Sequence, residues 1–364
     1  MNYNVLTDRS ISFLSELLAT HSPSGYEMPA AKVYSKYISK FCDSVYSDIM
    51  CNTVGVLSPD LEYKVLLAAH CDEIGFQIVY IDDNGFLYFR AIGGIDKHTV
   101  LGKEVSINTP KGYITGIIGK KPPHIQDETE RNKVIDIADM WIDIGATNGD
   151  EAKSLVSIGS TVTLKSNFIK LGENRIASKG IDDKIGVFVV AETLRILSLK
   201  EVNVGVYGIA TSQEELGTRG IKTISNFISP NIGYVIDVGI STDVPNIKKT
   251  QYGEFRLGGG PGICHSADNN TKIVESLQNT AKLLKIPFQD ITWLRASGGT
   301  DTAELQLSKN GVATGLISIP SRYMHSSVEC CDLRDVDNAI YLLAETIVKL
   351  KGSESYLPYD VKND

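Results

Sequence analysis

Four short runs of mainly apolar residues are the feature that most restricts the fold of this 364-residue chain. Such runs are typical of strands buried on both faces, which occur in parallel sheets covered by helices. The stretches between them repeat apolar residues at helical spacing, as in 183–199, 270–286 and 335–351. The alternation predicts an α/β fold with a mixed, mostly parallel sheet and helices on both faces. The four runs are KVLLAAH (64–70), VNVGVYGIAT (202–211), NIGYVIDVG (231–239) and GVATGLISIP (311–320).

Residues 72–165 follow a different pattern, rich in glycine and in short runs of alternating apolar and polar residues. The tetrapeptide DDNG (82–85) stands between two such runs, which is a strong signal for a β-hairpin. We therefore expect a small inserted domain that resembles a β-barrel. Residues 1–71 and 166–364 would then form one α/β domain that is discontinuous in sequence, because insertions in surface loops are well tolerated.

The formal net charge of −8 argues against binding to nucleic acids or anionic membranes, which requires basic patches. No apolar run approaches the roughly 18 residues that cross a membrane. The N-terminal stretch also lacks the basic start and apolar block of a signal peptide. None of the six cysteines forms a C-x-x-C pair. We therefore expect a cytoplasmic protein with reduced thiols.

Histidines and carboxylates stand where the apolar runs end, or just before the helix expected at 183–199. Ligands of open α/β sheets bind outside the carboxyl ends of the strands, so we expect these side chains to meet in one crevice. The set comprises His70, Asp72, Asp182, Glu214, Glu215, Asp237 and His325.

Each member of this set also has an ordinary structural explanation. Asp182 or its neighbour Asp183 could be only the N-cap of a helix. Glu214 and Glu215 could be a pair of acidic residues that favours a helix start through the helix dipole. The recurrence of such groups at equivalent ends of several core elements favours a common site.

Two imidazoles and three carboxylates suit zinc, cobalt or manganese better than calcium. One tetrahedral ion needs fewer ligands, whereas two ions that share a carboxylate leave room for an activated water. The proton of that water must go to a carboxylate that binds no metal. Adjacent side chains point in different directions, so we expect Glu215 to bind metal and Glu214 to act as general base. Asp72 would orient the imidazole of His70.

Five motifs resemble those of the dinuclear-metal glutamyl/deblocking aminopeptidases, also called tetrahedral aminopeptidases, some of which are described as endoglucanases. Further matches extend the resemblance over nearly the whole chain, through GGID, KKPPH, DIGA, GGGPGICH and GGTDT. The five motifs are AAHCDEIGF, GIDDKIG, SQEELGTRG, VIDVGISTDVP and SIPSRYMHSSVE.

The resemblance implies a zinc-peptidase-like fold with two divalent ions per subunit, zinc or cobalt. His70, Asp182 and Asp237 would bind one ion, and Asp182, Glu215 and His325 the other, so that Asp182 is shared. It also implies that the inserted β domain takes part in dimerisation. Homo-oligomers would form from these dimers, up to a tetrahedral dodecamer.

The expected function is a metal-dependent aminopeptidase that removes the N-terminal residue from peptides, with Glu214 and Asp72 as its catalytic carboxylates. A deacylase or a carboxypeptidase would share the metal site. An endoglucanase-type glycosidase could use Glu214 and Asp72 without metal, although the chain has only two tryptophans for a sugar cleft. A non-catalytic scaffold is a further alternative.

A preference for acidic N-terminal residues would need a cationic pocket, for which the candidates are Lys248, Lys249, Arg295 and Arg322.

Overall fold

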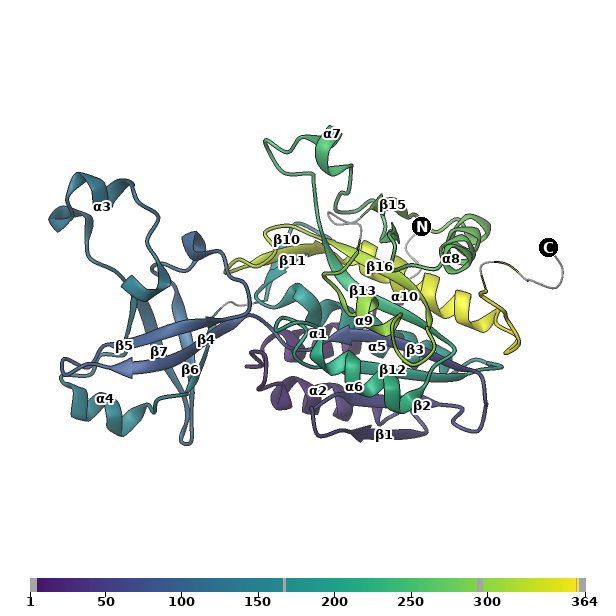
Figure 1. The fold of residues 1–364 in the computed structure, drawn as a ribbon, viewed down its shortest axis with the longest axis horizontal. Coiled ribbons are helices and arrows are strands. Elements are labelled where there is room, and N and C mark those ends of the chain that lie inside the picture. The colour runs from purple at the N-terminus through teal and green to yellow at the C-terminus, as the bar shows by residue number, and fades with distance from the viewer. Residues whose placement is uncertain (1–4, 166–167, 293–296, 358, 360–364) are drawn as a thin grey trace.

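The computed structural model describes residues 5–165, 168–292, 297–357 and 359. Its ribbon shows an α/β body and, projecting from one end of it, a smaller β structure (Figure 1). The candidate Arg295 lies outside the described residues.

An eight-stranded sheet forms the centre of the body, in the order β1-β2-β12-β3-β13-β16-β14-β15. The pairs β12–β3, β3–β13 and β13–β16 are parallel, whereas β2 and β14 are antiparallel to their neighbours β12 and β16. The predicted mixed, mostly parallel sheet is confirmed at its centre, and the four apolar runs form β3, β12, β13 and β16. The strands are β1 (Ser44–Ser47), β2 (Thr53–Leu57), β3 (Lys64–His70), β12 (Gly205–Thr211), β13 (Ile232–Ile240), β14 (Gly262–His265), β15 (Gln289–Thr292) and β16 (Ala313–Ser321).

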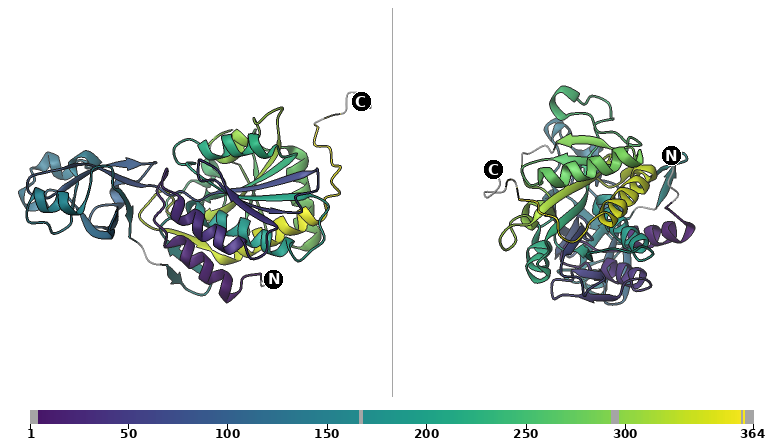
Figure 2. Two further views of the ribbon diagram at one scale, coloured as in Figure 1. Left: turned by 90° about the horizontal axis from the view of Figure 1, so that it is seen from below. Right: turned by 90° about the vertical axis from the view of Figure 1, so that its right-hand side faces the viewer.

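Helices cover both faces of this sheet, as predicted (Figure 2). Along β3, Val65 and Leu67 belong to one apolar core, and Leu66 and Ala68 belong to the other, because successive side chains of a strand point to opposite faces. The first core includes α1 (Asp8–Leu18), α2 (Met28–Ile38), α5 (Ile181–Leu197), α8 (Thr271–Leu284) and α10 (Leu333–Val348); the second includes α6 (Arg219–Ile228) and α9 (Asp301–Leu305). Within the described ranges, no helix is both long and apolar enough to cross a membrane.

The projecting structure is a closed barrel with the strand order β4-β5-β8-β7-β6-β9. DDNG lies between β4 and β5, which pair antiparallel as a hairpin. Phe76, Ile107 and Ile142 lie in an apolar core that the barrel does not share with the body. The expected barrel-like fold is confirmed, while the domain boundaries and the role of the barrel in dimerisation stay predictions. The strands are β4 (Gly75–Ile81), β5 (Leu87–Ile92), β6 (Glu104–Thr109), β7 (Gly112–Gly119), β8 (Trp141–Asp143) and β9 (Thr161–Leu164).

Smaller elements complete the chain. The body also contains a three-stranded sheet in the order β10-β11-β17. A four-residue helix, α7, stands in a loop that projects from the body (Figure 1). These elements are β10 (Ile169–Leu171), β11 (Arg175–Ser178), β17 (Glu329–Asp332), α3 (Glu128–Asn132), α4 (Gly149–Leu155), α7 (Lys249–Tyr252) and the 3-10 turns η1 (Lys97–Thr99), η2 (Pro123–Ile125) and η3 (Ile137–Asp139).

Hydrogen bonds from His21 and Asp96 are among the contacts that join the barrel to the body. The imidazole of His21, which follows α1, lies 2.9 Å from the hydroxyl of Thr161 and 3.0 Å from that of Thr163, both on β9. The backbone N–H of Asp96 donates to the carbonyl oxygen of His325 at 2.9 Å. The barrel therefore contacts the body on the side where the polar residues gather.

Candidate active site

The carboxylate of Asp182 lies between two imidazoles. Its Oδ1 is 3.0 Å from Nε2 of His70 at the end of β3, and its Oδ2 is 3.3 Å from Nε2 of His325 in the loop after β16. Burial works against ionisation of Asp182, but hydrogen bonds with His325 and His70 hold the pKa of this carboxyl well below its usual range. One carboxylate thus offers an oxygen to each of two histidines that are 255 residues apart in sequence.

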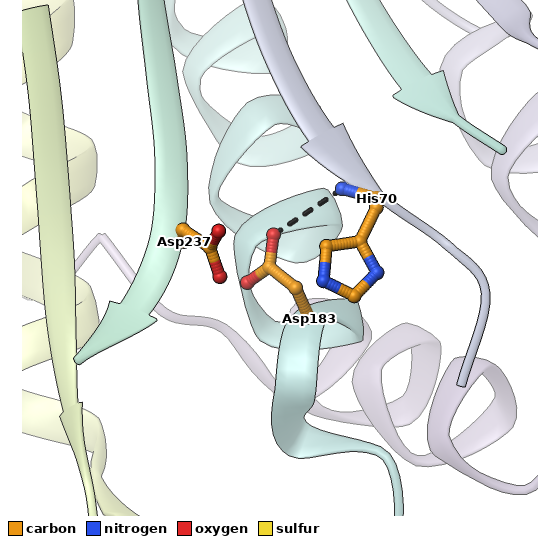
Figure 3. A group of neighbouring side chains, drawn as sticks. All are labelled: His70, Asp183 and Asp237. Carbon is orange, nitrogen blue, oxygen red and sulfur yellow. Dashed lines mark hydrogen bonds between the residues drawn. The ribbon is translucent and has the colours of Figure 1, made fainter. Parts of the chain in front are cut away.

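The five predicted ligands fall into two adjacent groups. His70, Asp183 and Asp237 form one group, and Asp182, Glu215 and His325 form the other, with donor atoms within 4.8 Å of one another in each. Figure 3 shows the first group, in which Asp183 at the start of α5 lies between the end of β3 and β13. The structure therefore brings all five residues together from four strand ends and one helix start, and it adds Asp183.

Asp183 has a different environment from its neighbour Asp182. Its Oδ2 accepts the backbone N–H of His70 at 3.3 Å, and its Oδ1 accepts that of Gly186 at 3.1 Å. The second bond resembles an N-cap, because the backbone at residues 182 and 183 is not yet helical. The N-cap interpretation thus applies to Asp183, and the oxygens of Asp182 remain directed at the imidazoles.

Asp72 contacts both sides of the site. The Nδ1 of His70 donates to the carbonyl oxygen of Asp72 at 3.1 Å and lies 3.5 Å from its carboxylate. This bond fixes the imidazole so that Nε2 faces Asp182. The carboxylate of Asp72, which is fully buried, also accepts the backbone N–H groups of Glu214 at 3.1 Å and Glu215 at 3.2 Å. It therefore orders the two glutamates as well as the histidine.

The two adjacent glutamates point to different histidines. Oε2 of Glu214 is 3.9 Å from Nε2 of His70, and Oε1 of Glu215 is 3.5 Å from Nε2 of His325. Both residues lie in the loop between β12 and α6, four or more residues before the helix begins at Arg219, so they are not a helix start. Burial raises the pKa of Glu214 well above its ordinary value and that of Glu215 to about 8.

The charges of this cluster fit divalent cations. Among the described residues, no lysine or arginine forms an ion pair with Asp182, Asp183, Glu214, Glu215 or Asp237. Burial raises the pKa of Asp183 and of Asp237 well above the ordinary range, so these carboxyls resist ionisation without a compensating cation. Carboxylate oxygens and imidazole nitrogens are the donors that zinc and cobalt accept.

Glu329 is a site residue that sequence reasoning missed. Its carboxylate accepts the backbone N–H of Asp182 at 2.9 Å and that of His325 at 3.0 Å. Burial raises the pKa of Glu329 to about 8. A signal was available, because this residue closes the motif MHSSVE that contains His325. Glu329 fixes the backbone of two predicted ligands at once.

Two of the cationic residues considered for an acidic substrate pocket form ion pairs with other residues. Arg322 forms an ion pair with Asp243 at 2.7 Å, and Lys249 forms one with Glu254 at 2.8 Å. Lys248 is the N-cap residue of α7. These contacts give no support to a cationic pocket made by this set.

Comparison with known proteins identifies the family. The sequence model of the M42 glutamyl aminopeptidase family matches residues 52–342. This range is most of the chain and includes all five predicted ligands. The chain belongs to this family. It is 33% identical to the lysyl aminopeptidase of Pyrococcus furiosus over 341 residues, which cover 93% of this chain and 96% of that one.

Solved structures of M42-like peptidases have the same fold. The TET aminopeptidase from the marine sediment archaeon Thaumarchaeota archaeon SCGC AB-539-E09 superposes with a TM-score of 0.90 at 34% identity, covering 94% of this chain and 97% of that one. The Pyrococcus horikoshii TET1 peptidase, described as assembling into a tetrahedron or a large octahedral shell, gives 0.84 at 31% identity and covers 94% and 100%. This M42 protein is an aminopeptidase, a hydrolase of peptide bonds.

Proposed function

We propose that this M42 aminopeptidase removes the N-terminal residue from peptides with the help of two divalent ions. His70, Asp182 and Asp237 would hold one ion, and Asp182, Glu215 and His325 the other. The observation that carries this proposal is the position of Asp182, with Oδ1 facing His70 and Oδ2 facing His325. A carboxylate that presents one oxygen to each of two ligand groups is suited to bridge two ions.

The bound ions, zinc or cobalt, would polarise the peptide carbonyl and lower the pKa of a water molecule. Glu214 would take the proton of that water on its carboxylate and deliver it to the leaving amine. Its location supports this role, because Oε2 lies 3.9 Å from Nε2 of His70 and, among the described residues, no lysine or arginine forms an ion pair with Glu214.

Asp72 would act on the reaction through its neighbours. Its carbonyl oxygen orients the imidazole of His70, and its carboxylate holds the backbone of Glu214 and Glu215. Asp72 would therefore help to set the distance between a metal ligand and the base.

Peptides are the partners that this activity requires. A homo-oligomer is supported by the likeness to the Pyrococcus horikoshii TET1 peptidase, which can assemble into a tetrahedron or a large octahedral shell. Assembly from dimers, with the barrel at the dimer contact, stays a prediction. The free cysteines agree with a cytoplasmic location, which stays a prediction.

The test is to strip the purified enzyme with a chelator and to restore zinc, cobalt or manganese singly. Turnover of a panel of aminoacyl-anilides and the metal content per subunit are then measured. We expect activity to vanish on stripping and to return with about two ions bound per subunit. Asp182→Asn should lose both ions, whereas Asp60→Asn, at an exposed position, should lose neither. Full activity in the stripped protein, or a single ion at full activity, would contradict the proposal.

A further inference from the structure

Buried side chains accept the backbone N–H groups at the start of the loop that carries Glu214. Four successive backbone N–H groups, from Ser212 to Glu215, each donate to a side-chain oxygen of a distant residue. The donor–acceptor distances are 3.0 Å from Ser212 to Asn52 Oδ1, 3.2 Å from Gln213 to Glu27 Oε1, 3.1 Å from Glu214 to Asp72 Oδ1 and 3.2 Å from Glu215 to Asp72 Oδ2.

The backbone of this loop needs such support. Gln213, directly before Glu214, has a φ of +54°, in the left-handed region that is unfavourable for a residue other than glycine. Gln213 lies between the end of β12 at Thr211 and the start of α6 at Arg219. The backbone N–H of Arg219 donates to the carbonyl oxygen of Gln213 at 3.2 Å, whereas the N–H of Gln213 itself donates to Glu27. The acceptor of the Gln213 N–H, Glu27, therefore holds one of the two non-glycine residues of this loop with a positive φ, the other being Thr218.

Glu27 and Ser24 belong to one short segment, SPSGYE (22–27), between α1 and α2. Oε1 of Glu27 accepts the N–H of Gly25 at 2.5 Å in addition to that of Gln213. The hydroxyl of Ser24 donates to Oδ2 of Asp72 at 2.6 Å. Both side chains are only 2% exposed, so they touch the loop and Asp72 rather than solvent.

We propose that Glu27 and Ser24 are positioning residues for Glu214. Glu27 fixes the peptide unit that precedes the base, and Ser24 fixes the carboxylate of Asp72, which in turn holds the N–H of Glu214. Neither residue contacts the predicted metal ligands by a side-chain hydrogen bond among the described residues. The proposal rests on the role of Glu214 as general base, and its effect is on turnover rather than on metal binding.

Asn52 does not share this role, although it accepts the N–H of Ser212. Its amide also donates to Asp48 at 2.7 Å and to the carbonyl oxygen of Gly220 at 3.2 Å, and so it links β1, β2 and α6. Loss of Asn52 would disturb the packing of these elements as well as the loop. Glu27 offers the more specific test because its contact is to the residue next to the base.

The experiment compares Glu27→Ala with Glu27→Gln in the full-length, metal-loaded enzyme. In Glu27→Gln the side-chain amide retains a carbonyl oxygen for the Gln213 N–H, whereas alanine leaves that N–H without an acceptor. We expect kcat for an aminoacyl-anilide to fall roughly 10- to 100-fold in Glu27→Ala, with KM changed by less than about threefold. Glu27→Gln should retain kcat within about threefold, and the metal content of both variants should match the wild type.

Hydrogen exchange provides a readout independent of activity. The peptide covering 212–215 should exchange faster in Glu27→Ala than in Glu27→Gln or the wild type, because only alanine releases the N–H of Gln213. A folded, metal-loaded Glu27→Ala with kcat within about twofold of the wild type would overturn the proposal. Equal losses in both variants would overturn it too, since the acceptor oxygen would then be irrelevant.

Ser24 keeps the proposal testable should Glu27→Ala fail to fold. Ser24→Ala should lower kcat with little change in KM, and Ser24→Thr, which keeps the hydroxyl, should recover it. Equal turnover of these two variants would count against the positioning role. Glu214→Gln is assayed alongside as a reference. Near-normal turnover in that variant would show that the base assignment has failed, whereas an inactive Glu214→Gln beside a fully active Glu27→Ala would show that only the positioning role has failed.

Discussion

The carboxylate of Asp72 accepts the backbone N–H of Glu214, with 3.1 Å between Oδ1 and the nitrogen. The same residue accepts the Nδ1–H of His70 on its carbonyl oxygen. The main chain of the proposed base and the imidazole of a predicted ligand are therefore fixed to one buried aspartate. A residue in this position influences metal binding and proton transfer without needing to touch the substrate.

Asp72→Asn should lower kcat, metal affinity or both by about 10- to 100-fold. The amide oxygen can still accept the N–H of Glu214. In the wild type, however, Oδ2 of Asp72 accepts hydrogen bonds from the N–H of Glu215 and the hydroxyl of Ser24, and the NH2 group that replaces it cannot accept them. Steady-state kinetics and the metal content of the purified variant measure the effect. Asp60→Asn, which makes the same change at an exposed position, is the control. Wild-type kinetics with full metal content would show that Asp72 orders nothing of importance.

Glu214→Gln should reduce kcat by about 10²- to 10⁴-fold while both ions remain bound, because glutamine fits the same space but cannot accept the proton. Glu214→Asp is the matched variant: it keeps the carboxylate but shortens the side chain, and it should fall between the wild type and glutamine. The measurements are kcat, KM and metal content. Near-normal turnover of a metal-loaded Glu214→Gln would remove Glu214 from the mechanism.

The arrangement of the sheet follows directly from the sequence because the central strands are buried on both faces. The run KVLLAAH is apolar from Val65 to Ala69, because Val65 and Leu67 pack in one core while Leu66 and Ala68 pack in the other. The predicted metal ligands follow from the same logic, because parallel strands deliver their end residues to one edge. His70 and Asp237 come from the neighbouring parallel strands β3 and β13.

The choice between Asp182 and Asp183 could not be made from residue patterns alone. Both stand at the entry to α5, and their backbone angles depart from the helix, so helical periodicity does not describe where the two side chains point. The resemblance to the family favoured Asp182, and the structure directs its oxygens at the two histidines. The contact of Glu27 with Gln213 could not be predicted for another reason. The two residues are 186 positions apart, and no pattern in a single sequence relates them.

A buried ion cluster beside the site provides a test of stability. Glu73 is 2.8 Å from the ammonium of Lys179 and 2.9 Å from that of Lys184, and all three side chains are at most 9% exposed. Glu73→Ala would leave two buried ammonium groups without their carboxylate, and we expect it to lower the free energy of unfolding by about 3–5 kcal/mol. Lys36→Ala removes a lysine from an exposed pair with Glu16 and should change it by less than about 1 kcal/mol. The free energies of unfolding of both variants are measured by urea denaturation. Equal losses in the two variants would mean that burial of the cluster does not increase its contribution to stability.

His21, which connects the body to β9 of the barrel, should make the protein less stable in acid. Burial lowers the pKa of His21 to about 4, whereas the pKa in the unfolded chain is about 6.5. The unfolded state therefore binds a proton first as the pH falls, and the stability that is complete above pH 6.5 is lost progressively down to pH 4. The expected slope from this group is about 1.4 kcal/mol per pH unit, or about 3 kcal/mol in all.

His21→Gln tests this dependence, because glutamine does not titrate. The free energy of unfolding is measured by urea denaturation between about pH 7 and pH 4 for the wild type and the variant. Contributions of all other groups, bound metal included, cancel in the difference between the two proteins at each pH. That difference should shrink as the pH falls, since the wild type alone loses the contribution of His21. His124→Gln, at an exposed position, should run parallel to the wild type. A constant difference between His21→Gln and the wild type over the whole range would mean that His21 takes up its proton equally well in the folded and unfolded states.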